Sequence, residues 1–152
     1  MKYARIEKKG ELLSQGYVID ASSLFKLLFL NSDQEILPIL SHSFILDLTL
    51  YEIGSILNKG NDRHISGLDN EKVIALANEF SKVLDAVGRI SLDPEDLKKV
   101  LILSLEKGLT FYDAAYIFQS QKLNLPLLTN DRKMASAGKK AGITVKKAEE
   151  IA

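Results

Sequence analysis

Four acidic residues stand where an apolar, strand-like run gives way to a helix-like run, or within the first turn of such a helix: Asp20, Glu52, Asp113 and Asp131. We call them the acidic quartet. In an alternating α/β chain, the ends of parallel strands and the starts of the following helices lie along one edge of the sheet, so residues far apart in sequence can meet there. Gathered carboxylates repel one another unless a cation holds them together. Because all-oxygen ligands suit Mg²⁺ or Mn²⁺, the quartet predicts a metal site for phosphate chemistry.

Each member of the quartet also has an ordinary structural explanation. Glu52 comes three residues after Thr49, and Asp113 three residues after Thr110, so both fit a capping box in which the acid reaches back to the start of its helix. Asp20 could simply end its strand, and Asp131 could stabilise the start of its helix through the helix dipole. Independent caps gathered at one edge would concentrate negative charge there, which costs free energy without a metal or a basic partner. Taken together, the quartet therefore favours a metal site.

Short, continuously apolar runs alternate with segments of helical periodicity along the chain. The runs predicted to be strands span 17–20, 44–47, 89–92 and 125–129, and one more follows Gly142. The predicted helices span 22–30, 50–58, 70–86, 93–107 and 111–122, with another before Gly142. Gly88 is expected to cap the third of these helices, and Pro94 to open the fourth. Apolar strands separated by helices predict an α/β fold with a parallel sheet covered on both faces.

The chain is expected to form one domain. Its 152 residues are enough to bury a substantial core, and no linker, repeat or low-complexity tract divides them. Residues 1–16 are polar and aperiodic, which predicts an N-terminal extension to a single domain over 17–152. Hydrophobic residues make up 46% of the chain and charged residues 26%, the balance of a globule that folds unaided.

The composition excludes or disfavours several classes of function. The chain has no cysteine, so disulfides and thiolate zinc sites are excluded. No apolar run approaches a membrane span, and the first residues lack the apolar core of a secretory signal, so we expect a cytoplasmic protein. Lysine plus arginine and aspartate plus glutamate number 20 each. Any case for nucleic-acid binding must therefore rest on local charge rather than net charge.

Four blocks of sequence, from residue 17 onwards, resemble those of PIN-domain nucleases in order and spacing. They are YVIDASS at 17–23, LTLYEIGSIL at 48–57, GLTFYDAAY at 108–116 and LLTNDRKM at 127–134. The last two are close to the blocks of VapC-type toxins of toxin–antitoxin pairs. The resemblance implies a PIN-like three-layer α/β/α sandwich with a central parallel sheet of four to five strands. It also implies an endoribonuclease that depends on one or two Mg²⁺ or Mn²⁺ ions at the quartet.

Within this resemblance the quartet supplies the catalytic acids. Asp20 and Asp113 are expected to be the principal metal ligands, while the other two acids complete the shell directly or through water. Ser22 and Thr129 are hydroxyl neighbours that could bond a phosphate or a ligand carboxylate, and helix capping explains them equally well. The resemblance further implies a homodimer, and a cognate antitoxin whose C-terminal segment covers the acidic site. An arginine of this segment could occupy the acidic site in place of the metal.

A basic stretch follows the last acid of the quartet. Between residues 131 and 147 the chain carries Arg132, Lys133, Lys139, Lys140, Lys146 and Lys147. Two explanations stay open for it: a solvated helix face, which is the common case, and a track for the RNA backbone. The nearness of the stretch to Asp131 keeps the RNA track in consideration, with its first four basic residues as the candidate contacts.

The helix near residue 100 is apolar over more than one face, which predicts either full burial in the core or a subunit interface. His42 and His64 lie outside the four blocks without a ligand partner at zinc spacing, so we expect them at the surface. Neither a Gly-x-Ser-x-Gly elbow nor a phosphate-cradling glycine loop is present.

Two other functions stay open. A non-catalytic module of the same fold could use an acidic pocket to hold a basic peptide. An α/β phosphotransfer domain of receiver or phosphatase type also gathers aspartates around Mg²⁺. Such domains put an acidic pair at the first strand, whereas Asp20-Ala21-Ser22 supplies one acid. The resemblance to PIN-domain nucleases favours hydrolysis of RNA phosphodiester bonds over both alternatives.

Overall fold

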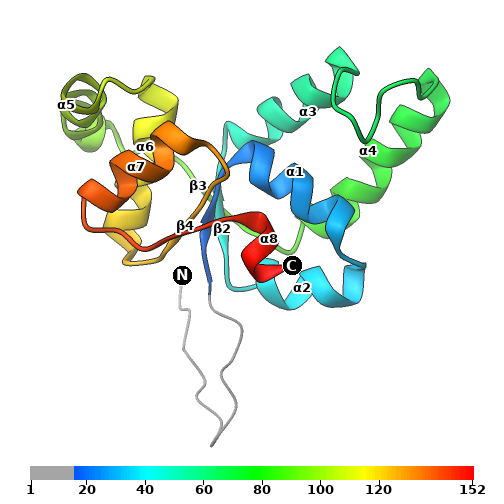
Figure 1. Cartoon of the computed structure of the whole chain (residues 1–152), viewed down its shortest axis with the longest axis horizontal. Coiled ribbons are helices and arrows are strands. Elements are labelled where there is room, and N and C mark those ends of the chain that lie inside the picture. The colour runs from blue at the N-terminus through cyan, green and yellow to red at the C-terminus, as the bar shows by residue number, and fades with distance from the viewer. Residues whose placement is uncertain (1–15) are drawn as a thin grey trace, which may run out of the picture.

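Five parallel strands form the central sheet of the protein. The computed structural model describes residues 16–152, and its strands lie in the order β3-β2-β1-β4-β5 (Figure 1). Their bounds are β1 Val18–Ile19, β2 Phe44–Leu46, β3 Gly88–Ile90, β4 Leu127–Leu128 and β5 Val145–Lys146. The predicted parallel sheet of four to five strands is therefore confirmed.

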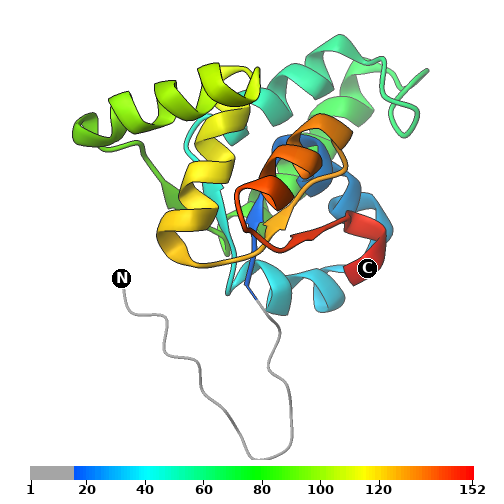
Figure 2. The same cartoon turned by 60° about the vertical axis from the view of Figure 1, so that its left-hand side comes forward.

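Helices cover both faces of this sheet. On one face lie α1 Ala21–Leu30, α2 Asp33–Leu40, α3 Thr49–Lys59, α4 Asn70–Leu84 and α8 Ala148–Ile151. On the other lie α5 Leu97–Lys107, α6 Phe111–Leu123 and α7 Arg132–Lys140. A short 3₁₀ turn, η1 Pro94–Asp96, leads into α5. The two helical layers are visible on either side of the strands in Figures 1 and 2, so the predicted three-layer α/β/α sandwich is confirmed.

Each central strand contributes to both hydrophobic clusters, because successive strand side chains point to opposite faces of the sheet. The cluster beneath α1 to α4 and α8 takes Ile19, Ile45 and Leu128 from the strands. The cluster beneath α5 to α7 takes Val18, Leu46 and Leu127. These side chains are all buried. Burial on both faces explains why the strands are continuously apolar rather than alternating apolar and polar.

The strand directions fix where the quartet can meet. Parallel strands place their carboxyl ends together, and the antiparallel helices that cover them begin at the same edge. Asp20 follows β1 and is the N-cap of α1, while Asp131 follows β4 and is the N-cap of α7. Thr110 is the N-cap of α6, three residues before Asp113. The quartet therefore lies along one edge of the sheet.

Two short helices were not predicted from the sequence. Helix α2 carries a capping box between Ser32 and Glu35, so a start signal was present, but Pro38 inside the helix argued against it. Helix α8 has four residues, too few to show a helical period.

The predicted cap at Gly88 was wrong. Helix α4 ends at Leu84 with Asp85 as its C-cap, and Gly88 is the first residue of β3, paired with Phe44 of β2. By contrast Gly108, which directly follows the helix predicted over 93–107, caps α5 with a φ of 62° that favours glycine. The segment predicted as one helix over 93–107 consists of two parts, the 3₁₀ turn η1, whose first residue is Pro94, and then helix α5.

Full burial of the helix near residue 100 was also wrong. Helix α5 packs against α6 and buries Val100, but Leu97 is 55% exposed and Leu105 73% exposed. Leu101 and Ile102 are exposed as well. Because only one side of α5 meets the body of the protein, its remaining apolar side chains form a surface strip.

The predicted N-terminal extension, residues 1–16, lies outside the described residues except for Gly16. A Cβ atom at Gly16 would lie 1.9 Å from the carbonyl oxygen of His42, so the chain enters β1 against backbone that leaves no room for a side chain. Within residues 16–152, no helix has both the length and the hydropathy needed to cross a membrane.

Candidate functional site

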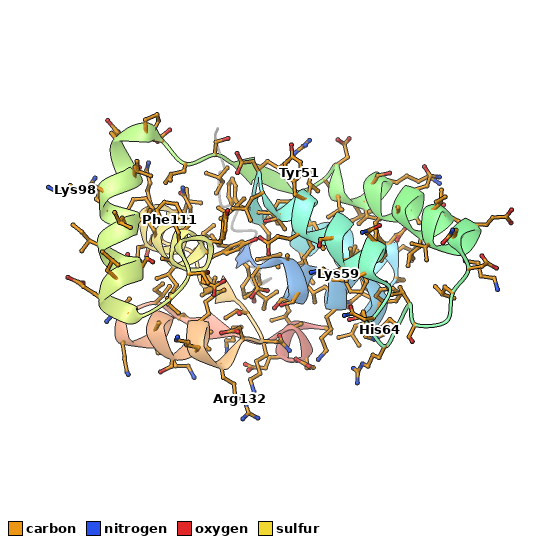
Figure 3. All side chains as sticks on the ribbon, turned by 90° about the horizontal axis from the view of Figure 1, so that it is seen from above. Tyr51, Lys59, His64, Lys98, Phe111 and Arg132 are labelled. Carbon is orange, nitrogen blue, oxygen red and sulfur yellow. The ribbon has the colours of Figure 1, made fainter. Side chains whose placement is uncertain are left out.

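All four members of the quartet line one pocket at the carboxyl edge of the sheet. The pocket has a volume of about 290 Å³. Its wall consists of Asp20, Ala21, Ser22, Glu52, Ser55, Ile56, Lys59, Asp113, Tyr116, Asp131 and Met134. Figure 3 views the molecule from this side and shows Lys59 near its middle, while Arg132 projects from its outer side. The structure thus brings together acids that are far apart in the sequence, with Asp131 lying 111 positions after Asp20.

Asp20 is the most buried acid of the quartet, with 3% of its surface exposed. Its Oδ1 accepts a hydrogen bond from the backbone N–H of Ser23 at 2.9 Å, and its Oδ2 accepts one from the hydroxyl of Thr129. The Ser22 hydroxyl lies 3.5 Å from Oδ1. Burial is the main cause that raises the pKa of Asp20, and the charge of Asp131 adds to it, while the bonds from Ser23 and Thr129 oppose the shift.

Thr129 links two acids of the quartet. Its buried hydroxyl donates to Asp20 and accepts from the backbone N–H of Asp131 at 3.1 Å. Asp131 in turn caps α7 by accepting from the backbone N–H of Met134 at 2.7 Å. The Thr129 hydroxyl therefore bonds a carboxylate of the quartet and also the backbone at the start of α7. The residue holds the start of α7 against the start of α1.

Asp113 lies half-buried in the first turn of α6. Its backbone N–H donates to the hydroxyl of Thr110 at 3.1 Å, so the predicted cap at Thr110 is present. Burial is the main cause that raises the pKa of Asp113, and the charges of Asp131 and Asp20 add to it. The hydrogen bond with Thr110 and the charge of Lys133 act in the opposite direction.

Glu52 is oriented by a hydroxyl pair rather than by a capping box. The predicted cap at Thr49 was wrong, because the N-cap of α3 is Leu48, whose backbone is already helical and whose side chain has no polar atom. The Thr49 hydroxyl lies 2.6 Å from the Tyr116 hydroxyl, which donates to Glu52 Oε1 at 3.1 Å. Burial raises the pKa of Tyr116 well above its ordinary value, so the hydroxyl keeps its proton. Burial also raises the pKa of Glu52, against the hydrogen bond from Tyr116.

The electrostatics and donor atoms of this pocket fit a hard divalent cation. Burial and mutual repulsion raise the pKa of Asp20, Glu52 and Asp113, and a cation among them would relieve both effects. The wall offers carboxylate and hydroxyl oxygens, and it contains neither histidine nor cysteine. Such a donor set suits Mg²⁺ or Mn²⁺ rather than zinc.

Sequence reasoning missed three polar residues of the wall. Ser55 and Lys59 lie three and seven residues after Glu52 on α3, and Tyr116 lies three residues after Asp113 on α6. These spacings put side chains on the same helical face. Helical periodicity counted from each acid would therefore have found them.

The candidate RNA contacts are all exposed residues of α7: Arg132, Lys133, Lys139 and Lys140. Helix α7 buries Met134 and Ala137 on its opposite side, as a solvated amphipathic helix does. Lys133 nevertheless lies close enough to the pocket for its charge to lower the pKa of Asp113. Both explanations of the basic stretch therefore remain open.

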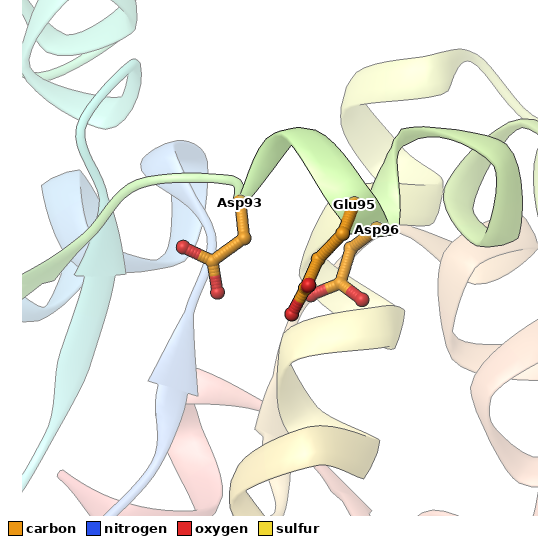
Figure 4. Close-up of side chains that lie close together, drawn as sticks. All are labelled: Asp93, Glu95 and Asp96. Carbon is orange, nitrogen blue, oxygen red and sulfur yellow. The ribbon is translucent and has the colours of Figure 1, made fainter.

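A second acidic group, Asp93, Glu95 and Asp96, lies at η1 and does not line the pocket (Figure 4). Within residues 16–152 it is the one place where oxygens of three acids come within 4.8 Å of one another, so the quartet surrounds its pocket at wider spacing. The Lys122 ammonium already bridges this group, at 2.9 Å from Asp93 and 2.6 Å from Asp96. A metal would have to displace that ammonium, so we interpret the group as an ion-pair network that ties η1 to α6.

Neither histidine lines the pocket. His42 Nδ1 lies 2.9 Å from the carbonyl oxygen of Pro38. His64 Nδ1 lies 2.9 Å from Asp62 Oδ1, and its ring stacks on Phe29 with centroids 4.7 Å apart. Both histidines have local structural partners at the partly exposed surface.

Comparison with known proteins gives matches that span this site. Residues 17–140 match the PIN domain family, and every residue of the pocket wall lies in that range. Exonuclease VapC9 of Pyrobaculum aerophilum is 34% identical over 128 residues, which cover 82% of this chain and 87% of that protein. Ribonuclease VapC3 of the same organism is 35% identical over 91 residues, 59% of this chain and 66% of that protein. The crystal structure of PAE2754, also from Pyrobaculum aerophilum, has a TM-score of 0.73 and 29% identity, covering 90% of this chain and 92% of that one.

Proposed function

Because the chain belongs to the PIN-domain family, we propose that it is a metal-dependent endoribonuclease and the toxin of a toxin–antitoxin pair. The observation that carries this proposal is the single pocket in which the carboxylates of the quartet meet. Two relatives carry the names exonuclease and ribonuclease together with the VapC designation, which supports both the RNA substrate and the toxin role.

The proposed cofactor is Mg²⁺ or Mn²⁺, as one or two ions. Asp20 and Asp113 would be the principal ligands, with Glu52 and Asp131 completing the shell directly or through water. Such a cation, when bound, lowers the pKa of water and stabilises negative charge on a phosphate.

The residues of the chain prepare this site by holding its acids in place. Ser23 and Thr129 donate to the two oxygens of Asp20, and Tyr116 donates to Glu52. Hydrogen bonds to ligand carboxylates fix their orientation before a metal binds. Since these donors lie on buried or half-buried positions, the acids are ordered by the core of the fold.

Lysines at the pocket supply the proposed contacts to the RNA backbone. Lys59 belongs to the pocket wall, and among residues 16–152 it forms no ion pair within 4 Å. An unpaired ammonium beside carboxylates suits a phosphate of the substrate. Lys133 on α7 and its basic neighbours would extend this contact along the strand of RNA.

RNA cleavage tests the proposal, with Asp113→Asn as the variant and Asp47→Asn as its matched control. Asp47 also ends a strand at this edge of the sheet, but it is exposed and does not line the pocket. The wild type and Asp47→Asn should cleave RNA with Mg²⁺ or Mn²⁺ and stop when EDTA is added. Asp113→Asn should lose more than about 100-fold in rate, because even the outer partners of metal ligands contribute about 10–100-fold. Undiminished cleavage by Asp113→Asn would refute the site.

A circular RNA distinguishes the two modes of hydrolysis. An endonuclease opens the circle, whereas an exonuclease needs an end, and one relative bears the name exonuclease. Cleavage of linear RNA alone would correct the proposal to an exonuclease. Metal binding with no cleavage of either substrate would favour the basic-peptide module instead.

The second proposed partner is a cognate antitoxin whose C-terminal segment covers the pocket. Gathered carboxylates with raised pKa values would accept an arginine of such a segment as well as a metal ion, because either cation offsets their charge. Purification of the chain from its native cell, followed by identification of the bound peptide, tests this. An RNA substrate and an antitoxin both fit the cytoplasmic location expected from the sequence.

We further propose a homodimer that buries the apolar strip of α5. This strip comprises Leu97, Leu101, Ile102 and Leu105. Adjacent exposed apolar side chains of this kind are typical of an association surface.

A further inference from the structure

We infer that Tyr116 is a positioning residue: its hydroxyl, itself oriented by Thr49, holds the carboxylate of Glu52 in the direction of the pocket and so raises the affinity of the pocket for a divalent cation. The inference rests on the metal site proposed above. It adds to that site two residues from outside the acidic quartet.

The contacts form one continuous chain of hydrogen bonds. The Thr49 and Tyr116 hydroxyls are 2.6 Å apart, and the Tyr116 hydroxyl is 3.1 Å from Glu52 Oε1. Thr49 is fully buried and Tyr116 is 1% exposed, so bulk water does not compete for the bond between their hydroxyls. These bonds also link the two helical layers, because Thr49 and Glu52 lie on α3 in one layer and Tyr116 lies on α6 in the other.

The direction of the hydrogen bonds follows from the chemistry of the three groups. An ionised carboxylate only accepts hydrogen bonds, and a phenol has one hydrogen to donate. Tyr116 therefore gives its hydrogen to Glu52, and its oxygen accepts the hydrogen of Thr49. The reverse direction would turn a phenol lone pair toward the carboxylate.

This arrangement leaves one oxygen of Glu52 for a ligand. Tyr116 engages Oε1, and among residues 16–152 no hydrogen bond reaches Oε2. Glu52 lines the pocket, so the free oxygen can serve a cation there. A glutamate has several side-chain rotamers to lose on binding, and a fixed Oε1 removes part of that entropic cost in advance. Thr129 likewise donates to a quartet carboxylate, at Asp20 Oδ2, although there the other oxygen accepts from the backbone N–H of Ser23.

Titration of the RNA-free protein with Mn²⁺, followed by calorimetry, tests the inference. The variants are Tyr116→Phe, Glu52→Gln and the two combined, with Tyr112→Phe as a control on the same helix at an exposed position. Tyr116→Phe should weaken Mn²⁺ binding by about 10-fold or more, the usual effect of removing a partner of a metal ligand. In the Glu52→Gln background the same change should have less than about a 2-fold effect, because the group it positions is gone. Tyr112→Phe should bind like the wild type.

A merely structural role gives a different pattern, because it would weaken binding equally in both backgrounds. Equal losses, or unchanged affinity of Tyr116→Phe, would overturn the inference. Tyr116→Phe leaves the buried Thr49 hydroxyl without its acceptor, so Thr49→Val is added to it in a second variant that keeps the pair apolar and the fold intact. That variant should show the same dependence on Glu52, and failure to do so would equally overturn the inference.

The proposed function can fail separately. If the wild type binds Mn²⁺ with the predicted dependence on Tyr116 but cleaves no RNA, the nuclease is refuted and the positioning role stands. If the wild type binds no Mn²⁺, both are refuted.

Discussion

Replacement of Asp20 by Asn should preserve the stability of the metal-free fold and remove most of the additional stability that a bound metal provides. Asparagine is as good an N-cap as aspartate, so it can still accept from the backbone N–H of Ser23. Its amide NH₂ would face the Thr129 hydroxyl, which can rotate to accept. Because burial raises the pKa of Asp20, its charged form is disfavoured in the metal-free fold, and the neutral amide removes that penalty. The metal-free variant should therefore be at least as stable as the wild type.

The variant should instead lose the stabilisation that a bound metal gives to the folded state. A ligand that binds only the folded state, at 100 times its dissociation constant, stabilises a protein by about 2.7 kcal/mol. For a domain of this size, 1 kcal/mol corresponds to about 2–4 °C in Tm, so saturating Mn²⁺ should raise the Tm of the wild type by about 5–11 °C. Asp20→Asn should show a small fraction of this rise, since the most buried acid of the pocket has become neutral.

Thermal unfolding with and without Mn²⁺ measures both effects. Asp69→Asn is the matched control, because Asp69 caps α4 in the same way, accepting from Lys72 N–H at 2.9 Å, but lies outside the pocket. It should keep the full metal-induced rise. The reasoning is refuted if Asp20→Asn keeps that rise as well, or if the metal-free variant unfolds well below the wild type.

The raised pKa values of three quartet carboxyls predict that the Mn²⁺-induced rise in Tm shrinks as the pH falls from neutrality, because protons compete with the metal. An acid whose pKa is higher in the folded than in the unfolded state destabilises the metal-free fold at neutral pH, and this penalty vanishes as the pH falls through the folded pKa. The stability advantage of Asp20→Asn over the wild type should therefore diminish on acidification. An advantage that grows on acidification would contradict this. Lys59→Met should weaken RNA binding and reduce its salt-dependence slope by about 1 without weakening Mn²⁺ binding, as measured by fluorescence anisotropy across salt concentrations and by calorimetry. Lys139→Glu with Lys140→Glu should flatten the same slope, and an unchanged slope would assign both lysines to a solvated helix face. Leu105→Glu should convert the proposed dimer to a monomer in light scattering, and a monomeric wild type at high concentration would count against the dimer.

The sequence was sufficient to predict the sheet and the helix starts that surround the pocket. Asp20 and Asp131 could be placed because each follows an apolar run and begins a helix, and parallel strands bring such points together. Asp113 could be placed through the cap at Thr110, which the structure retains. The order of the four sequence blocks supplied the remaining support for the resemblance to PIN-domain nucleases.

What could not be predicted depends on contacts between elements that are distant in sequence. Thr49 has the spacing of a cap, but its hydroxyl bonds to Tyr116, 67 positions away. Gly88 resembles a helix terminator, but its pairing with Phe44 of β2 makes it part of a strand. Tertiary pairing overrides local propensity in both cases. The exposed side of α5 likewise follows from which neighbour α5 meets, and an apolar count along the chain does not reveal that.

Anomalous diffraction from a crystal of the protein soaked in Mn²⁺ would reveal directly whether the quartet binds the metal. We expect an anomalous peak inside the pocket of the quartet, at a metal–oxygen distance of about 2.0–2.6 Å from the carboxylates of Asp20 and Asp113. A pocket without a peak, or a peak found at Asp93, Glu95 and Asp96 in place of Lys122, would contradict it.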